Sequence, residues 1–310
     1  MHEALAIART FTEKDLPDLD VVTLAALQLF SEISLPELPK GTFKHPLVVG
    51  SVNALAAGIM AFSDENAVFA DESTFQQALK NNPSIDGIYL ISASGSKHAI
   101  TIAEVVSDRN LPCILITNNP NAPAAVDLPP KNVVCFPRNR EPYSYNTSTY
   151  LGMVLAATKE SPSDIQNSLS NVSSQLAKLS TAHTAYTFIL PSSSGPITSM
   201  VRVKFDELFG PKLVGRAFTE EEVKHAKTIV GGGEEVFISI GVTNKHYGTE
   251  DNRISISLPE GARYGTILAT AYYVVGHIQR LHPPYFKQGI EAYVTQLSEV
   301  FNQPFSVIVE

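Results

Sequence analysis

The chain has 310 residues, 44% of them hydrophobic and 17% charged, which is enough for one large domain or two medium ones with a full core. Its formal net charge of −8 and the absence of a basic patch argue against nucleic acid and anionic membranes as partners. No run of about 18 apolar residues marks a membrane span. The N-terminus lacks the basic-then-apolar order of a signal peptide. We therefore expect a cytoplasmic protein.

The chain contains two cysteines, and both stand in apolar runs. Cys113 lies in "LPCILIT" and Cys135 in "NVVCFP". Such placement is typical of buried thiols in a reducing compartment and not of a disulfide framework. We expect both thiols to be buried.

Short apolar runs alternate with helical patterns over the first half of the chain. Continuous apolar strands with helices between them indicate a parallel sheet that is covered on both faces. This pattern predicts a doubly wound α/β fold. The predicted strands are "PLVVG" (46–50), "NAVFA" (66–70), "GIYLIS" (87–92), "PCILIT" (112–117) and "NVVCFP" (132–137).

A polar, serine-rich segment at 161–181 separates two similar schemes. Its apolar residues recur at helical spacing, so we predict a helix that links two halves. After it, "AYTFILPSSSGPITSMVRVKF" (185–205) echoes "HPLVVGSVNALAAGIMAF" (45–62) as strand, small-residue turn and helix. Further strands are predicted at "PKLVGRAF" (211–218), "EEVFISIG" (234–241) and "RISISLP" (253–259), and two closing helices at 264–281 and 287–302.

The stretch "LISASGSKHAITIAE" (90–104) places small and hydroxylated residues directly after a buried strand. At the carboxyl end of a parallel strand, such a loop faces the crevice where ligands bind. Serine hydroxyls and the amide groups of the following helix suit an anion, most often a phosphate. Lys97 is the one full positive charge in the stretch. The alternative is an ordinary strand-to-helix turn capped by serine.

Ser92-Ala93-Ser94-Gly95, followed by a helix and "LPCILITNNPNAPAA", resembles the phosphate loop of the sugar isomerase (SIS) domain family. "VVGSVNALAAG" resembles that family's first strand and turn, and "REPYSYNTSTYLGMVLA" (140–156) the segment that opens a later helix. The chain departs from the family at Ser96-Lys97, where Glu-Thr is frequent. The residues that the resemblance assigns to phosphate or sugar binding are Ser51, Ser92, Ser94, Gly95, Ser96, Lys97, Glu141 and Thr147.

The resemblance covers almost the whole chain as two SIS-type doubly wound halves, each a parallel sheet flanked by helices. It implies a first domain at 1–160 with the phosphate loop and a second at 161–310 with the C-terminal helices. The stretch "FISIGVTNK" (237–245) of the second half has no Ser-x-Ser-Gly motif. One phosphate site per chain is therefore expected.

The stretch 201–228 resembles the isomerase domain of glucosamine-6-phosphate synthases. Glu207 and Lys204 fall on one motif of that family, and Glu222 and His225 on another. The resemblance implies that Glu207 moves a proton between C1 and C2 of an open-chain sugar phosphate. It also implies that a neighbouring subunit donates His225 for ring opening.

The physical requirements of the reaction agree with that assignment. Isomerisation needs a base near the α-proton, and apolar neighbours such as Phe205 and Phe209 would raise the pKa of a nearby carboxylate. The alternative is that Glu207 is a surface acid and His225 a helix-end histidine.

The C-terminal segment "HPPYFKQGIEAY" resembles the tail of fructosamine-6-phosphate deglycases. Its Lys287 is either a substrate contact or a helix-start lysine. The last residues, "NQPFSVIVE", lack the lysine of the synthases, which argues against synthase activity.

These features predict a phosphosugar isomerase or deglycase that acts on a ketose or amino-sugar 6-phosphate as a homodimer or larger homo-oligomer. No cofactor is expected. No metal site is expected either, because the histidines lack metal-ligand spacing with acids or cysteines. The alternative is a non-catalytic phosphosugar sensor.

Overall fold

A computed structural model describes residues 3–226 and 235–310 of the chain. By internal contacts the chain divides into two compact units, each of which holds one larger parallel sheet. The first-sheet unit comprises Ile33–Arg138 and Ser148–Lys159, and the second-sheet unit comprises Met1–Glu32, Asn139–Thr147 and Glu160–Glu310. None of the described helices is long and apolar enough to cross a membrane.

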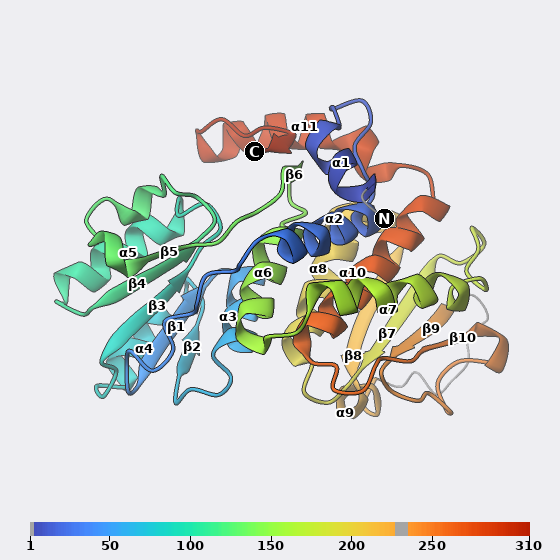
Figure 1. Cartoon of the computed structure of the whole chain (residues 1–310), viewed down its shortest axis with the longest axis horizontal. Coiled ribbons are helices and arrows are strands. Elements are labelled where there is room, and N and C mark those ends of the chain that lie inside the picture. The colour runs from blue at the N-terminus through green and yellow to red at the C-terminus, as the bar shows by residue number, and fades with distance from the viewer. Residues whose placement is uncertain (1–2, 227–234) are drawn as a thin grey trace. The chain divides into compact units, whose positions relative to one another are not determined.

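The first-sheet unit is built on five parallel strands in the order β2-β1-β3-β4-β5 (Figure 1). The strands are β1 (Pro46–Gly50), β2 (Val68–Ala70), β3 (Gly87–Ile91), β4 (Cys113–Thr117) and β5 (Val133–Cys135). The helices are α3 (Asn53–Ala61), α4 (Phe75–Asn81), α5 (His98–Asp108) and α6 (Thr147–Thr158), with short 3₁₀ turns η1 (Pro123–Ala125) and η2 (Pro130–Asn132).

Helices cover both faces of this first sheet. On one face Leu47 and Leu90 pack with Phe75 of α4 and Ile102 of α5. On the other face Gly58 of α3 lies so close to Val48 and Ile91 that an added Cβ would be 2.8 Å from a Val48 methyl group. Burial on both faces explains why the strand sequences are continuously apolar.

The second-sheet unit is built on four parallel strands in the order β10-β9-β7-β8. They are β7 (Ala185–Leu190), β8 (Val214–Thr219), β9 (Glu235–Ile240) and β10 (Arg253–Ile256). The helices are α1 (Glu3–Thr10), α2 (Leu19–Glu32), α7 (Pro162–Gln175), α8 (Gly195–Phe209), α9 (Glu220–Val223), α10 (Tyr264–Leu281) and α11 (Tyr285–Phe301), with 3₁₀ turns η3 (Gly210–Lys212) and η4 (Glu250–Asn252). A short antiparallel ladder joins β6 (Glu141–Pro142) to β11 (Ile308–Val309).

The side chains of β7 alternate between the two faces of this second sheet. The rings of Tyr186 and Phe188 pack on Phe205 of α8, whereas Ile189 packs with Val223 of α9 and Phe237 of β9. The core of the unit therefore extends over both faces, as in the first-sheet unit.

The two sheets share one topology. Read from the second strand of each, β2-β1-β3-β4 corresponds to β8-β7-β9-β10. In sheets of this kind the order in which strands are added reverses between the first and third strands. The crevice at that switch point is the usual place for a ligand. The predicted α/β fold with two parallel, helix-flanked sheets is confirmed.

Several local expectations differ from the structure. The helix predicted at 161–181 ends at Gln175. The strand predicted at 234–241 appears as Glu235–Ile240, and residue 234 lies outside the described residues. The domain boundary predicted at residue 160 stays a prediction; by packing, residues 3–32 group with the second sheet.

The two thiols have different surroundings. Cys113 is buried on β4, and burial raises the pKa of its thiol to about 12. Cys135, predicted to be buried, is exposed because it is the last residue of the edge strand β5. Both are free cysteines.

Helices α2 and α10 pack closely and are joined by an ion pair between the buried Asp20 and the exposed Arg280. Asp20 is 2% exposed, and its carboxylate lies 2.9 Å from the Arg280 guanidinium. Gln279 accepts a hydrogen bond from the Leu19 amide at 2.9 Å. Burial raises the pKa of Asp20 from 3.8 to about 6, although the Arg280 charge opposes the shift.

We expect Asp20 to make the free energy of unfolding fall as the pH rises from about 4 to about 6. Its carboxyl holds a proton more tightly in the folded state, so the unfolded state releases that proton first. Stability then falls by about 1.4 kcal/mol per pH unit over this window and stays lower above it. Urea titrations at pH 4 and pH 7 should show Asp20→Asn gaining stability relative to the wild type as the pH rises. A difference between the two proteins that is independent of pH would contradict this assignment.

Candidate functional site

The ends of β1 and β3 form the switch-point edge of the first sheet. The two strands are adjacent and parallel, and Gly50 is in register with Ile91. Ser51 and Ser92, which follow these residues, therefore emerge at the same edge of the sheet. This is the position where a ligand crevice is expected in a sheet of this order.

The loop Ser92–Lys97 is tied down through its carbonyl groups by the segment that follows β4. Thr117 Oγ1 donates to the Ala93 carbonyl at 3.0 Å, and Asn119 Nδ2 donates to the Ser94 carbonyl at 2.9 Å. The Gly95 carbonyl accepts from the Ala124 amide at 2.8 Å. This explains the "ITNN" sequence (116–119) at the end of β4 and just after it: its side chains and amides shape the loop.

Gly95 is required at its position. Its φ is +63°, and an added Cβ would lie 2.3 Å from Ala122 Cβ. The left-handed backbone and the close approach each favour glycine. The glycine singled out in the sequence thus has a structural reason.

The hydroxyl and amide groups of the loop gather within hydrogen-bonding distance of one another. Ser92 Oγ accepts from the Gly95 amide at 3.2 Å, and Ser94 Oγ accepts from the Ser96 amide at 3.3 Å. Ser94 Oγ and Ser96 Oγ share a further hydrogen bond of 2.7 Å. The structure brings together these four predicted residues, and their hydroxyls can rotate to donate to an anion.

Two residues with positive φ flank this edge of the sheet. Lys97, before α5, has φ +54°, and Val52, before α3, has φ +45°. Such backbone is costly for a residue that is not glycine, and for a β-branched residue it is an outlier that is concentrated at functional sites. Lys97 is partly buried, which lowers its pKa. The sequence carried no signal for the strained conformation of Val52.

Glu141 and Thr147 lie together in the second-sheet unit. Glu141 Oε2 accepts from the Thr147 amide at 2.7 Å, so this buried carboxylate caps the start of α6. Thr147 Oγ1 is buried and has no hydrogen-bond partner among the described residues. Their predicted contact with a sugar phosphate stays a prediction.

Lys204 and Glu207 form an ion pair on α8. Lys204 is fully buried; its Nζ also donates to the Ser144 carbonyl at 2.7 Å and lies 5.8 Å from the centre of the Tyr272 ring. The Glu207 side chain is 25% exposed. Burial raises the pKa of Glu207, and the neighbouring Lys204 opposes that shift. Glu207 is thus a partly desolvated carboxylate with a fixed cationic partner.

Two tyrosines that the sequence analysis missed lie near Glu207. The rings of Tyr143 and Tyr293 are 6.3 Å apart. Burial raises the pKa of Tyr143 to about 12, and the charges of Tyr293 and Glu207 add to the effect. Tyr143 stands in the stretch "REPYSYNTSTY" (140–150), but its neighbours Tyr293 and Glu207 come from distant segments of the chain.

The remaining predicted residues have structural partners or are exposed. Glu222 forms a capping box with Thr219, in which its Oε2 accepts from the Thr219 amide at 2.8 Å. Lys287 forms an ion pair of 2.8 Å with Asp18. His225 is exposed just after α9. Their predicted roles in catalysis stay predictions.

No group of three His, Cys, Asp or Glu side chains is placed to hold a metal ion in the part of the chain that the structure describes. The first-sheet unit thus holds a loop of hydroxyls and amides, and the second-sheet unit holds a paired carboxylate and lysine.

No protein family model and no curated protein sequence matches the chain. Solved structures do match it. The C-terminal domain of glucosamine-fructose-6-phosphate aminotransferase from Francisella tularensis matches with a TM-score of 0.62 at 14% identity, over 87% of this chain and 95% of that one.

Two further solved structures are similar over most of the chain. Glucosamine-6-phosphate deaminase from Thermotoga maritima gives a TM-score of 0.60 at 16% identity, over 86% of this chain and 95% of that one. Tagatose-6-phosphate ketose/aldose isomerase from Escherichia coli gives 0.55 at 15% identity, over 94% and 92%. At these identities the likeness extends to the fold, and the chain therefore has the α/β fold of these three proteins.

Proposed function

We propose that this protein is a phosphosugar isomerase or deglycase that acts on a ketose or amino-sugar 6-phosphate. The observation that carries the proposal is the Ser92–Lys97 loop at the switch point of the first sheet. Its hydroxyls and amides converge, its carbonyls are tied back by the segment after β4, and strained residues flank it. Three proteins of the same fold carry names of sugar 6-phosphate enzymes, which supports this substrate class.

Glu207 is the proposed base. It removes a proton from C1 or C2 of the open-chain substrate and returns it to the neighbouring carbon, while a hydroxyl proton moves to the former carbonyl oxygen. No atom is gained or lost in an aldose–ketose exchange. An N-linked fructosamine 6-phosphate begins with the same proton transfer, and water then releases the amine. A raised pKa, as burial gives Glu207, suits a carboxylate to this task.

The proposal includes a cytoplasmic homodimer in which His225 serves the site of a neighbouring subunit. His225 is exposed, as a residue given to a neighbour must be in the single chain. Two free thiols are compatible with a reducing compartment. Lys204 holds Glu207, Glu222 is the competing candidate for the base, and Lys287, Glu141 and Thr147 are proposed at the margins of the site.

Replacing Ser94 by aspartate is expected to abolish the binding of fructose 6-phosphate. A carboxylate within about 4 Å of a phosphate costs about 4 kcal/mol at the effective dielectric of a protein surface, more than a 100-fold loss of affinity. Ser94 is exposed, so the fold should tolerate the change. Isothermal titration calorimetry with fructose 6-phosphate measures the loss.

The matched control is Ser84→Asp. Ser84 is also exposed in the first-sheet unit, but it precedes β3 and so lies at the opposite end of that strand from the loop. It should bind fructose 6-phosphate as the wild type does. Equal affinity of the Ser94→Asp and Ser84→Asp proteins for fructose 6-phosphate would show that the Ser92–Lys97 loop is not the phosphate site.

A further inference from the structure

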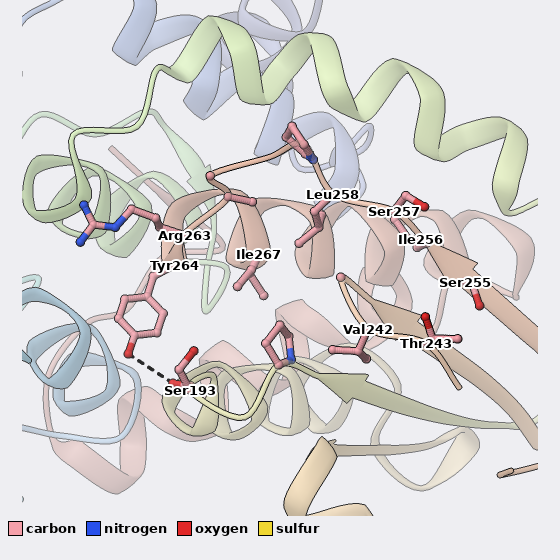
Figure 2. A pocket seen from close by; sticks show the side chains of 15 residues that line it. Ser193, Val242, Thr243, Ser255, Ile256, Ser257, Leu258, Arg263, Tyr264 and Ile267 are labelled. Atoms are coloured by element: carbon pink, nitrogen blue, oxygen red, sulfur yellow. Dashed lines mark hydrogen bonds between the residues drawn. The ribbon is translucent and has the colours of Figure 1, made fainter. Parts of the chain in front are cut away.

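A pocket of about 580 Å³ lies at the switch point of the second sheet (Figure 2). It is lined by residues that follow β7 and β9, by the end of β10 and the residues after it, and by the start of α10. The strands β7 and β9 correspond to β1 and β3 of the first sheet, so this pocket lies at the sheet edge that corresponds to the edge with the Ser92–Lys97 loop. Its volume is in the range of small-molecule sites.

Hydroxyl groups dominate the polar lining of the pocket. Ser193, Thr243, Ser255 and Ser257 contribute hydroxyls, and Figure 2 labels all four around the pocket. The Tyr264 hydroxyl donates to the Ser193 carbonyl at 3.2 Å, which places an aromatic ring at one end. None of the fifteen described lining residues is acidic, and Arg263 is the one among them with a positive charge.

An apolar surface accompanies these hydroxyls. It consists of Pro191, Val242, Ile256, Leu258 and Ile267. A ligand that combines several hydroxyl groups with a C–H face can satisfy both parts of such a lining.

At the helix N-termini beside the pocket, amide groups that could bind a phosphate already donate hydrogen bonds to other groups of the chain. Glu160 accepts hydrogen bonds from the amides of Arg263, Gly265 and Thr266 at 2.7, 2.7 and 3.1 Å. The N-terminus of α10 is thus neutralised by a carboxylate of the chain itself. That charge also disfavours a phosphate dianion nearby.

The start of α8 also offers few amide donors to a ligand. Pro196 has no amide hydrogen, and the amides of Ile197 and Thr198 donate to the Ser194 carbonyl at 2.9 and 3.1 Å. Ser194 donates its own amide to the Pro191 carbonyl at 2.8 Å. The turn after β7 thus uses these three amides itself.

We propose that this pocket is a second ligand site, for a neutral monosaccharide without a phosphate group. The hydroxyl groups and the apolar surface of the pocket recognise the sugar. Glu160, which accepts from the amides at the start of α10, selects against a phosphorylated sugar. The site lies within one compact unit and does not rest on the function proposed for the first sheet.

The test uses the Ser94→Asp protein, so that the first-sheet loop does not contribute. Glucose, fructose and N-acetylglucosamine serve as probes, with glucose 6-phosphate as the phosphorylated comparison. At least one neutral sugar should raise the thermal midpoint, because a ligand that binds only the folded state stabilises it by mass action. Glucose 6-phosphate should bind at least about tenfold more weakly than that sugar.

Thr243→Trp fills the pocket and should weaken the binding of that neutral sugar at least about tenfold. Thr243 is exposed, so a larger side chain leaves the core untouched. Thr249→Trp is the matched control: it is an exposed threonine of the same connection that does not line the pocket, and it should retain full binding. Equal binding in both tryptophan variants, no response to a neutral sugar at 20 mM, or tighter binding of glucose 6-phosphate each overturns the proposal. Failure of fructose 6-phosphate to bind the wild type would count against the first-sheet proposal alone.

Discussion

Replacing Glu207 by glutamine is expected to lower turnover by roughly two to four orders of magnitude and to leave the binding of hexose 6-phosphates intact. Glutamine keeps the shape of the side chain and an oxygen that can still accept from Lys204, but it cannot take a proton at neutral pH. The separation of rate from affinity is the diagnostic part of the result. Steady-state turnover and calorimetric affinity for fructose 6-phosphate, measured on one preparation, provide both quantities.

Glu222→Gln is the control for this experiment. Glu222 is the competing acid from the motif comparison, but it is exposed and its carboxylate caps α9. Glutamine also serves in a capping box, so this variant should keep its turnover and most of its stability. Lost turnover in Glu222→Gln with full turnover in Glu207→Gln would reverse the assignment. If both variants turn over a bound hexose 6-phosphate as fast as the wild type, the catalytic role of Glu207 fails. A wild type that binds hexose 6-phosphates but turns none of them over is a sensor.

Replacing Gly276 by alanine should destabilise the second-sheet unit by at least about 3 kcal/mol, the upper end of overpacking effects. An added Cβ would lie 1.9 Å from the Asp20 nitrogen and 2.7 Å from the Asp20 Cα. These are backbone atoms of α2, so no side chain can move aside. Helices α2 and α10 would have to separate around the Asp20–Arg280 ion pair, with loss of buried contact along their length.

Gly289→Ala is the matched control for the glycine experiment. Gly289 also lies inside a helix, α11, but an added Cβ meets no atom within 4 Å. There alanine should raise stability by about 0.5–1 kcal/mol through its helix propensity. Urea unfolding of both variants measures the contrast. A Gly276→Ala protein as stable as Gly289→Ala would show that the α2–α10 packing is looser than described.

The positions of the strands followed from local patterns in the sequence. Continuous apolar runs such as 46–50 and 112–117 mark strands that are buried on both faces, and they appear as β1 (46–50) and β4 (113–117). The loop after β3 was also predictable, because small and hydroxylated residues at a strand exit are typical of a tight turn into a helix. A local sequence pattern is enough to predict a strand or a turn that its own residues determine.

The missed features depend on distant parts of the chain. The exposure of Cys135 follows from β5 being at the sheet edge, which its apolar neighbours do not reveal. The positive φ of Val52 has no counterpart in residue type. Tyr143 and Tyr293 meet near Glu207 although 150 positions separate them in the chain. The pocket of the second sheet likewise needs three strand ends and a helix start that only the fold brings together.

The contrast between the two thiols makes the chain suitable for site-specific labelling without mutagenesis. A maleimide dye reacts with thiolate, and the buried Cys113, with a pKa of about 12, forms almost none at working pH. Cys135 is exposed, and its pKa is also raised by partial burial, so labelling should proceed at mildly alkaline pH. Cys135 is in register with Thr117, whose hydroxyl donates to the Ala93 carbonyl of the Ser92–Lys97 loop. A fluorophore there would stand at the same edge of the sheet as the loop and report directly on its occupancy.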